Sequence, residues 1–227
     1  MKKAESWLHK TLQYRFNDPD LFSRALTHRS ADGRNNERLE FLGDAVLDFV
    51  ISEALFALRP EADEGDLSRL RASLVKDSSL AGLASGLGLG EFLILGSGER
   101  KSGGHRRESI LADALEALFG AIYLDAGFDA AKASIERVFG ARLADLPDAR
   151  DLRDPKTRLQ EWLQGRQLSL PEYALLEVTG QDHRQRFDVS CTVAELSQIT
   201  EGTASSRRKA EQKAARAMLE ILAGDEP

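Results

Sequence analysis

The chain is poor in the features that mark several protein classes. It has one cysteine, Cys191, among 227 residues, so an intramolecular disulfide is excluded and a cysteine-rich zinc site is disfavoured. It has no run of about 18 uncharged apolar residues, the length that a membrane span needs. The N-terminus, MKKAESWLHKTLQYRF, has two lysines but no apolar segment after them, which argues against a secretory signal. We therefore expect a cytoplasmic protein with no membrane partner.

Excess positive charge is also missing. The formal net charge is −6 and the pI is about 5.4, which taken alone argues mildly against nucleic acid as a partner. Acids outnumber bases both before and after residue 153, so binding of a polyanion would have to come from local clustering. Hydrophobic residues make up 42% and charged residues 30% of the chain, a composition typical of soluble globular proteins.

A linker divides the chain into two predicted domains. The segment PDARDLRDP at 147–155 has two prolines, many charges and little apolar periodicity. We therefore expect a first domain over 1–147, a linker over 148–154 and a second domain over 155–227. Leu and Ala recur at helical spacing in the first domain, which predicts an all-α fold. Its expected helices are 4–13, 18–28, 35–58, 66–75, 76–87, 107–126 and 128–143.

The second domain has a different pattern. Residues 186–193, RFDVSCTV, alternate in polarity, which predicts a strand. Weaker strand candidates are 172–179 and 196–201, and helices are expected over 155–166 and 205–223. The order α-β-β-β-α predicts a small α+β domain with a three-stranded antiparallel sheet and helices on one face.

Acidic residues gather on one side of the helix expected within 36–51, NERLEFLGDAVLDFVI. At 100° per residue, Glu37, Glu40 and Asp44 share an arc of roughly 60°. The opposite side is apolar and holds Leu39, Leu42, Val46, Phe49 and Val50. Like charges one turn apart repel, and no Lys or Arg lies on the acidic arc. This pattern fits either a solvated acidic face or a functional cluster.

Two more acids lie in the middle of the segment ESILADALEALFGAIYLDAG at 108–127. The residues around Asp113 and Glu116 are apolar on all sides of the helix, which predicts burial. Buried carboxylates are costly unless they have partners. Those partners are either arginines, with Arg69, Arg71 and Arg107 as the candidates, or a divalent metal ion.

If the two helices face each other, their acids form a site that contains only oxygen ligands. No histidine or cysteine accompanies these acids in the two segments, which disfavours zinc and favours Mg²⁺, with Mn²⁺ as a possible substitute. Such an ion, bound to a few carboxylates and to substrate phosphate, can lower the pKa of a water that attacks phosphorus.

A basic cluster begins the last expected helix. Over 205–216 the cations outnumber the single acid, Glu211. Ser205 or Ser206 can cap this helix, which would leave backbone N–H groups beside the cations as a phosphate site. The plainer interpretation is a solvated helix end. The cations of the cluster are Arg207, Arg208, Lys209, Lys213 and Arg216.

Several segments, in this order, resemble bacterial ribonuclease III over essentially the whole chain. NERLEFLGDAVL at 36–47 is similar to the signature stretch of that family almost letter for letter. SSRRKAEQKAA at 205–215 resembles the end of a double-stranded-RNA-binding domain. The other similar segments are LTHRS (26–30), DEGDLSRLRASLV (63–75), KSGGHRRESILADALEALFGAIYLDAG (101–127) and DPKTRLQEWLQGR (154–166).

The resemblance implies a homodimeric, Mg²⁺-dependent endonuclease for double-stranded RNA. Its products would carry 5′-phosphate and 3′-hydroxyl ends with a short 3′ overhang. The expected substrates are ribosomal RNA precursors and some structured messenger and transfer RNAs. By position, Glu40, Asp113 and Glu116 resemble the metal ligands, and Asp44 resembles the fourth acid of the catalytic centre. Glu37 and Glu64 match auxiliary acids that lie near the cleavage site or face the RNA.

The resemblance also implies an RNA-binding set in the second domain. Its first helix would meet the minor groove, a loop between strands would place His183 at a neighbouring groove, and the last helix would face phosphates. The matching residues are Thr157, Gln160, Glu161, His183, Arg207, Arg208 and Lys209. Two alternatives stay open: a regulator that binds double-stranded RNA without cutting it, and a monomer whose apolar faces at 36–58 and 107–126 are both buried internally.

Overall fold

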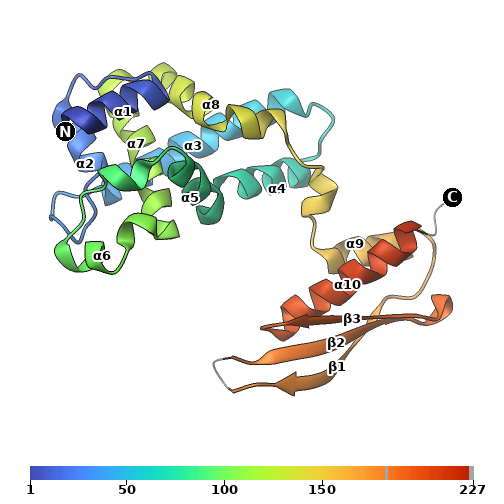
Figure 1. Cartoon of the computed structure of the whole chain (residues 1–227). Helices are drawn as coiled ribbons and strands as arrows, with labels where there is room; N and C mark the ends of the chain where they lie inside the picture. The colour runs from blue at the N-terminus through green and yellow to red at the C-terminus, as the bar shows by residue number, and fades with distance from the viewer. Residues whose placement is uncertain (182–183, 225–227) are drawn as a thin grey trace. The chain divides into compact units, whose positions relative to one another are not determined.

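The chain forms two compact units in a computed structural model that describes residues 1–181 and 184–224, without the side chains of 150, 151, 223 and 224. The units are Met1–Ala149 and Arg150–Pro227, and the division between them falls inside the proline-flanked segment 147–155. In Figure 1 the first unit runs from blue to yellow and the second from yellow to red.

The first unit is built from helices, as its sequence predicts, and has no strand beyond one isolated bridge between Thr27 and Ile94. A short helix over Ser97–Lys101 and two 3-10 turns, Leu89–Phe92 and Gly104–Arg106, were not predicted. The main helices are α1 (Lys2–Leu12), α2 (Pro19–Ala25), α3 (Glu37–Leu58), α4 (Glu64–Val75), α5 (Asp77–Gly86), α6 (Ser97–Lys101), α7 (Glu108–Ala126) and α8 (Phe128–Ala144).

Helix α7 is the centre of the first unit. It packs against α2, α3, α5 and α8, and Figure 1 shows it passing behind α5 toward α8. Most of its side chains are buried, including Leu115, Leu118 and Phe119, none of which is exposed. The all-apolar surroundings of Asp113 and Glu116 in the sequence follow from this central position.

Local signals set several boundaries of the first unit. The Asp18 side chain caps α2 by accepting from the Asp20 N–H at 2.9 Å, with Pro19 at the first helical position. The Asp125 carboxylate, near the end of α7, accepts from the Tyr14 hydroxyl at 2.5 Å and from the backbone N–H groups of Asn17 and Asp18 at 2.8 Å. The segment between α1 and α2 is thereby tied to α7.

The second unit has the predicted α-β-β-β-α order. Its elements are α9 (Pro155–Gln164), β1 (Glu172–Thr179), β2 (Arg186–Val193), β3 (Gln198–Ala204) and α10 (Arg207–Gly224), with 3-10 turns at Ala149–Leu152 and Ala194–Leu196. The sheet is antiparallel in the order β1-β2-β3, with Val189 opposite both Leu175 and Gly202. Strand β3 starts two residues later than expected, because the chain first makes a turn that ends at Ser197 in a left-handed conformation.

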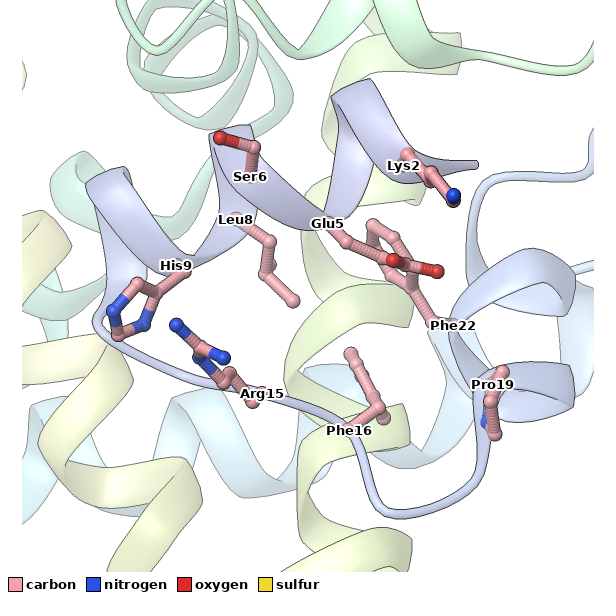
Figure 2. Close-up of a pocket in the computed structure, with 9 residues that line it drawn as sticks. All are labelled: Lys2, Glu5, Ser6, Leu8, His9, Arg15, Phe16, Pro19 and Phe22. Carbon is pink, nitrogen blue, oxygen red and sulfur yellow. The ribbon is translucent and has the colours of Figure 1, made fainter.

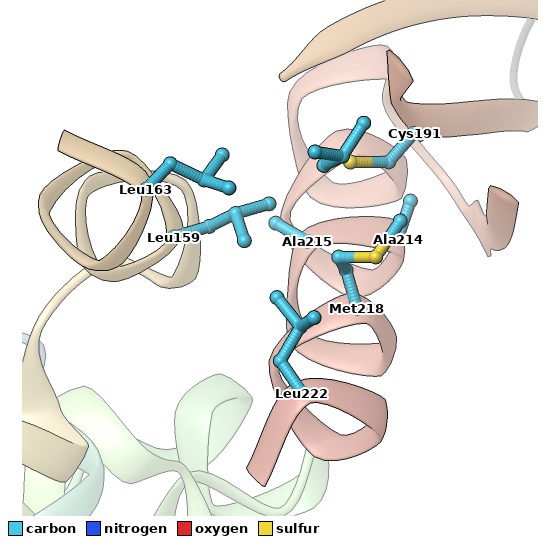
Figure 3. Close-up of a cluster of buried hydrophobic side chains, with 8 residues drawn as sticks. Leu159, Leu163, Cys191, Ala214, Ala215, Met218 and Leu222 are labelled. Atoms are coloured by element: carbon cyan, nitrogen blue, oxygen red, sulfur yellow. The ribbon is translucent and has the colours of Figure 1, made fainter. Parts of the chain in front are cut away.

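Both helices of the second unit cover one face of the sheet. Figure 3 shows Leu159 and Leu163 of α9 pointing toward Ala215 of α10. Helix α10 lies so close to β3 that a Cβ at Gly202 would come within 2.2 Å of the Ala210 carbonyl oxygen. The core consists of Leu159, Leu163, Cys191, Val193, Ala214, Ala215, Met218 and Leu222.

In the ranges 1–181 and 184–224, none of the helices combines the length and the apolar character needed to cross a membrane.

Candidate active site and nucleic-acid interface

Three predicted acids from two helices converge in the first unit. Glu40 is on α3, and Asp113 and Glu116 are one turn apart on α7. One carboxylate oxygen from each lies within 4.8 Å of the others, and all three residues are half-buried. The two acidic segments therefore lie face to face in the fold.

The convergence depends on a close crossing of α3 and α7. A Cβ at Gly43 would lie 1.8 Å from the Glu116 carbonyl oxygen, and a Cβ at Gly120 would lie 2.2 Å from the Leu39 carbonyl oxygen. Only glycine fits at either position with the two backbones at this separation. Because Gly43 lies one turn after Glu40 and opposite Glu116, it sets how near those two side chains come.

Arginines do not neutralise the acids, although the sequence left that alternative open. Arg69 pairs with Asp66, Arg71 faces Asp48 at 3.9 Å, and Arg107 pairs with Glu99 at 2.8 Å. Across the described ranges, no ion pair to Glu40, Asp113 or Glu116 is present. Among the described residues the cluster therefore has no paired cation, and a bound metal ion would supply one.

The electrostatics of the cluster disfavour three ionised carboxylates. Burial, and then the charges of Asp44 and Glu40, raise the pKa of Glu116 to about 8. Burial also raises the pKa of Glu40 and of Asp113, although Arg29 acts in the opposite direction on both. Burial and the like charges that share one site therefore favour the neutral form of these acids.

The remaining predicted acids lie outside the three-residue cluster. Asp44 is exposed on α3 and acts electrostatically on both Glu40 and Glu116. Glu37 is exposed in the first turn of α3 and pairs with Arg29 at 3.4 Å. Glu64 starts α4 and accepts a hydrogen bond from the Ser68 hydroxyl at 2.8 Å.

Sequence reasoning missed three neighbours of the cluster. Asp77, the first residue of α5, contributes to the raised pKa of both Asp113 and Glu116. His28 and Arg29 line a hollow of about 590 Å³ together with Glu40 and Asp113. His28 and Arg29 belong to the LTHRS segment, which stands out in the sequence only as a match to the family. Nothing in the local sequence places Asp77 near α7.

The donor set of the cluster fits a hard divalent cation. All of its ligand atoms are carboxylate oxygens, and Mg²⁺ and Mn²⁺ prefer oxygen, whereas zinc sites in proteins usually include nitrogen or sulfur. The hollow beside the cluster leaves room for water and for a substrate phosphate. Nothing in this arrangement selects one hard cation over another.

Six of the seven predicted RNA-binding residues of the second unit lie on its two helices. Thr157, Gln160 and Glu161 are exposed on α9, and Glu161 pairs with Arg153 at 2.9 Å. Position 183, which holds the predicted histidine, lies outside the described residues. The α9 side chains therefore form an exposed polar row on the side away from Leu159 and Leu163.

The start of α10 carries the predicted cations. The Ser206 hydroxyl accepts from the Lys209 N–H at 3.3 Å, as a cap should. Arg207 pairs with Glu211 at 3.0 Å, and Glu211 also pairs with Lys156. Arg208 and Lys209 are exposed, and neither forms an ion pair with any of the described residues. The helix start thus presents exposed cations at the positive end of the helix dipole, which suits a phosphate.

A second hollow of the first unit lies away from the acids. Figure 2 shows it between α1 and the segment that leads to α2, with Leu8, Phe16 and Phe22 around its apolar floor. His9 and Arg15 stand at one end of it. It has a volume of about 440 Å³ and shares no residue with the hollow beside the acid cluster.

A helical unit with facing acids, together with an α-β-β-β-α unit with a basic helix start, defines a class of protein: a nuclease with its own RNA-binding domain. Known families match both units. Residues 18–143 match the model of the family described as ribonuclease-III-like, and 155–222 match the double-stranded RNA binding motif. The chain belongs to the ribonuclease III family, whose members are double-strand-specific, metal-dependent endoribonucleases.

Relatives match over nearly the full length. Proteins named ribonuclease 3 from Alkalilimnicola ehrlichii and Dechloromonas aromatica are 57% and 58% identical, over 98% and 94% of this chain and 97% of each relative. The solved nuclease domain of ribonuclease III from Campylobacter jejuni is 49% identical, with a TM-score of 0.58, over 60% of this chain and 95% of that one.

Proposed function

We propose that Glu40, Asp113 and Glu116 hold the catalytic metal ion, that Asp44 completes the catalytic centre, and that the ion is Mg²⁺, with Mn²⁺ able to replace it. The convergence of three carboxylate oxygens within 4.8 Å, with no ion pair to them among the described residues, carries this proposal. When bound, the ion supplies an activated water and a charge that stabilises the phosphorane-like transition state.

The remaining acids have supporting roles in this proposal. Asp44 is exposed and close enough to act on Glu116, so it can hold water at the rim of the site. Glu37 and Glu64 lie at the first turns of α3 and α4, and we assign them contacts with the RNA backbone or with water rather than with the ion.

The proposed products and substrates follow from membership of the ribonuclease III family. Cleavage leaves a 5′-phosphate and a 3′-hydroxyl, with a short 3′ overhang between the two cuts. Precursors of ribosomal RNA and structured messenger and transfer RNAs in the cytoplasm are the proposed substrates. Recognition is mainly of A-form shape, through the exposed α9 residues Thr157, Gln160 and Glu161, His183, and the α10 residues Arg207, Arg208 and Lys209.

A second copy of this chain is the proposed partner. Phe41 is 80% exposed on α3, and Phe56 on the same helix is 74% exposed. Beside Phe41 lies a hollow of about 550 Å³ lined largely by apolar atoms. Large apolar side chains that stay exposed beside a hollow are typical of an interface. The Campylobacter jejuni nuclease domain is described as flexible in a region involved in dimer formation, which supports a dimer contact in the first unit.

The test of the function uses one labelled RNA duplex and its DNA counterpart, each with Mg²⁺ or with EDTA. The proposal predicts that only the RNA duplex is cut, and only with Mg²⁺, into fragments with 5′-phosphate ends and a short 3′ overhang on a sequencing gel. An RNA duplex that is shifted on a native gel but left uncut in Mg²⁺ would favour the binding-only regulator instead.

A further inference from the structure

The LTHRS segment, residues 26–30, is a fixed loop beside the acid cluster. The His28 N–H donates to the Ile94 carbonyl at 3.0 Å, and the Ile94 N–H donates to the Leu26 carbonyl at 2.8 Å. The Thr27 hydroxyl donates to the Ser23 carbonyl at 2.8 Å, and Thr27 is buried. The backbone that carries His28 therefore has little freedom to move.

The imidazole ring of His28 is also oriented by its own loop. The Ser30 N–H donates to His28 Nδ1 at 3.2 Å, and the Ser30 hydroxyl lies 2.8 Å from the same nitrogen. The Gly96 N–H donates to that hydroxyl at 3.0 Å, which leaves the hydroxyl proton free for Nδ1. A backbone N–H can only donate, so Nδ1 must accept, and the neutral ring carries its proton on Nε2.

Nε2–H has no hydrogen-bond acceptor within the part of the chain that the structure describes. The ring is half-buried and lines the hollow of about 590 Å³ that also holds Glu40 and Asp113. Arg29 and Arg107 line the same hollow. Both guanidinium groups already pair with a glutamate of the lining, Arg29 with Glu37 and Arg107 with Glu99. The oriented Nε2–H of His28 therefore remains as a donor that suits an anionic oxygen of the substrate, and a phosphodiester supplies one.

We propose that His28 contacts the substrate at the cleavage site, by donating a hydrogen bond from Nε2–H to a nonbridging phosphate oxygen of the RNA strand that is cut. Ser30 is then a positioning residue that fixes the ring. The inference rests on the proposed nuclease function. Because the donor is oriented before substrate binds, it contributes most when negative charge develops on the phosphate.

Two substitutions separate this role from a purely structural one. His28→Asn keeps an acceptor near the position of Nδ1 and removes the donor at Nε2. His28→Gln puts an amide N–H near the position of Nε2 and removes the acceptor that holds the loop. If His28 contacts the substrate, the His28→Gln variant should cleave faster than the His28→Asn variant. If His28 only holds the loop, the His28→Asn variant should cleave faster.

The measurement is single-turnover cleavage of an RNA duplex in Mg²⁺, with His9→Asn on the exposed side of α1 as the matched control. We expect His28→Asn to lower the cleavage rate about 100-fold, the effect of losing one oriented donor at a reacting anion. We expect His28→Gln to lose about tenfold or less, and the control to match the wild type. Duplex affinity, measured by gel shift in EDTA, should change less than twofold in all three variants.

Wild-type rates in His28→Asn, or a lower rate in His28→Gln than in His28→Asn, would overturn the assignment. If either variant has a lowered melting temperature, Ser30→Ala supplies the test. This variant should keep the wild-type melting temperature and duplex affinity, and its cleavage rate should be severalfold lower. A rate equal to wild type would again contradict the role. A wild-type protein that leaves RNA uncut in Mg²⁺ would overturn the proposed function itself, and this contact with it.

Discussion

The Cα of Gly43 on α3 lies so close to Glu116 on α7 that an added Cβ would stand 1.8 Å from the Glu116 carbonyl oxygen. This contact links backbone packing to chemistry, because Glu40 and Glu116 are held together by the same crossing. The acids meet where the helices are nearest, and glycine on both helices allows that approach.

Gly43→Ala should therefore damage both stability and metal binding. The added methyl group forces α3 and α7 apart, which costs about 1–3 kcal/mol as in other overpacked cores, and it separates the carboxylates. Urea unfolding and Mn²⁺ titration would measure the two effects. Gly140→Ala is the control: a Cβ there meets nothing within 4 Å, so it should stabilise α8 by about 0.5–1 kcal/mol. Equal Mn²⁺ affinity in both variants would refute the link.

Glu116→Gln should stabilise the metal-free protein at alkaline pH. Burial and neighbouring acids raise the pKa of Glu116 to about 8, above its value near 4.3 in an unfolded chain. Below about pH 4.3 Glu116 is protonated in both the folded and the unfolded state, so it does not lower the free energy of unfolding. As the pH rises from there toward 8, the carboxyl ionises more readily in the unfolded chain, and the free energy of unfolding falls. Glutamine stays neutral, so in EDTA at pH 8 the variant should be more stable by roughly 1–2 kcal/mol.

Mg²⁺ should reverse that order. A ligand that binds only the folded state stabilises it, and the wild type offers the complete carboxylate cluster. Thermal unfolding at pH 5 and pH 8, with EDTA or Mg²⁺, covers all of these cases. A variant that is less stable than the wild type in EDTA at pH 8 would show that Glu116 has a structural partner rather than a metal ion.

Arg208→Ala should weaken RNA binding in a salt-dependent way. If Arg208 contacts one phosphate, its loss lowers the slope of log affinity against log salt concentration by about 0.9. Gel shifts of an RNA duplex in EDTA at several salt concentrations measure that slope. Lys10→Ala, an exposed cation on α1 of the first unit, should leave it unchanged. Equal slopes for the two variants would place Arg208 outside the RNA interface.

Phe41→Ser should convert a dimer to a monomer. The side chain is 80% exposed in a single copy, so its removal costs little within the protomer and weakens the apolar contact with the partner. Sedimentation equilibrium should give a mass near 25.0 kDa for the variant and twice that for the wild type. Leu176→Ser, 53% exposed on β1, is the control and should stay dimeric. A monomeric wild type would contradict the proposed partner.

Much of the fold could be predicted from the sequence because its periodicities are strong. Strand β2 and the core positions Val189, Cys191 and Val193 follow from simple alternation. The all-apolar surroundings of Asp113 and Glu116 likewise predicted a central helix. The short helix α6 was missed because its five residues are too few for a period to show.

The site could be predicted only in part. One-turn spacing indicated which acids share a helix face, but nothing in the sequence excluded Arg69, Arg71 or Arg107 as their partners. The structure excludes them, because each pairs with or faces a different acid. Asp77 and His28 lie far along the chain from Asp113 on α7, the acid on which both act, so only the tertiary fold reveals that they are neighbours. Phe49 was placed on the apolar face of its helix, yet it is 59% exposed.

The central claim is that the Glu40, Asp113 and Glu116 cluster performs metal-dependent cleavage of double-stranded RNA. The most direct measurement compares the wild type with Glu116→Gln on one labelled RNA duplex in Mg²⁺, with cleavage and gel shift followed in parallel and circular dichroism as the folding control. We predict a folded variant that still binds the duplex and has lost turnover. A folded Glu116→Gln protein that cuts at the wild-type rate would contradict the claim.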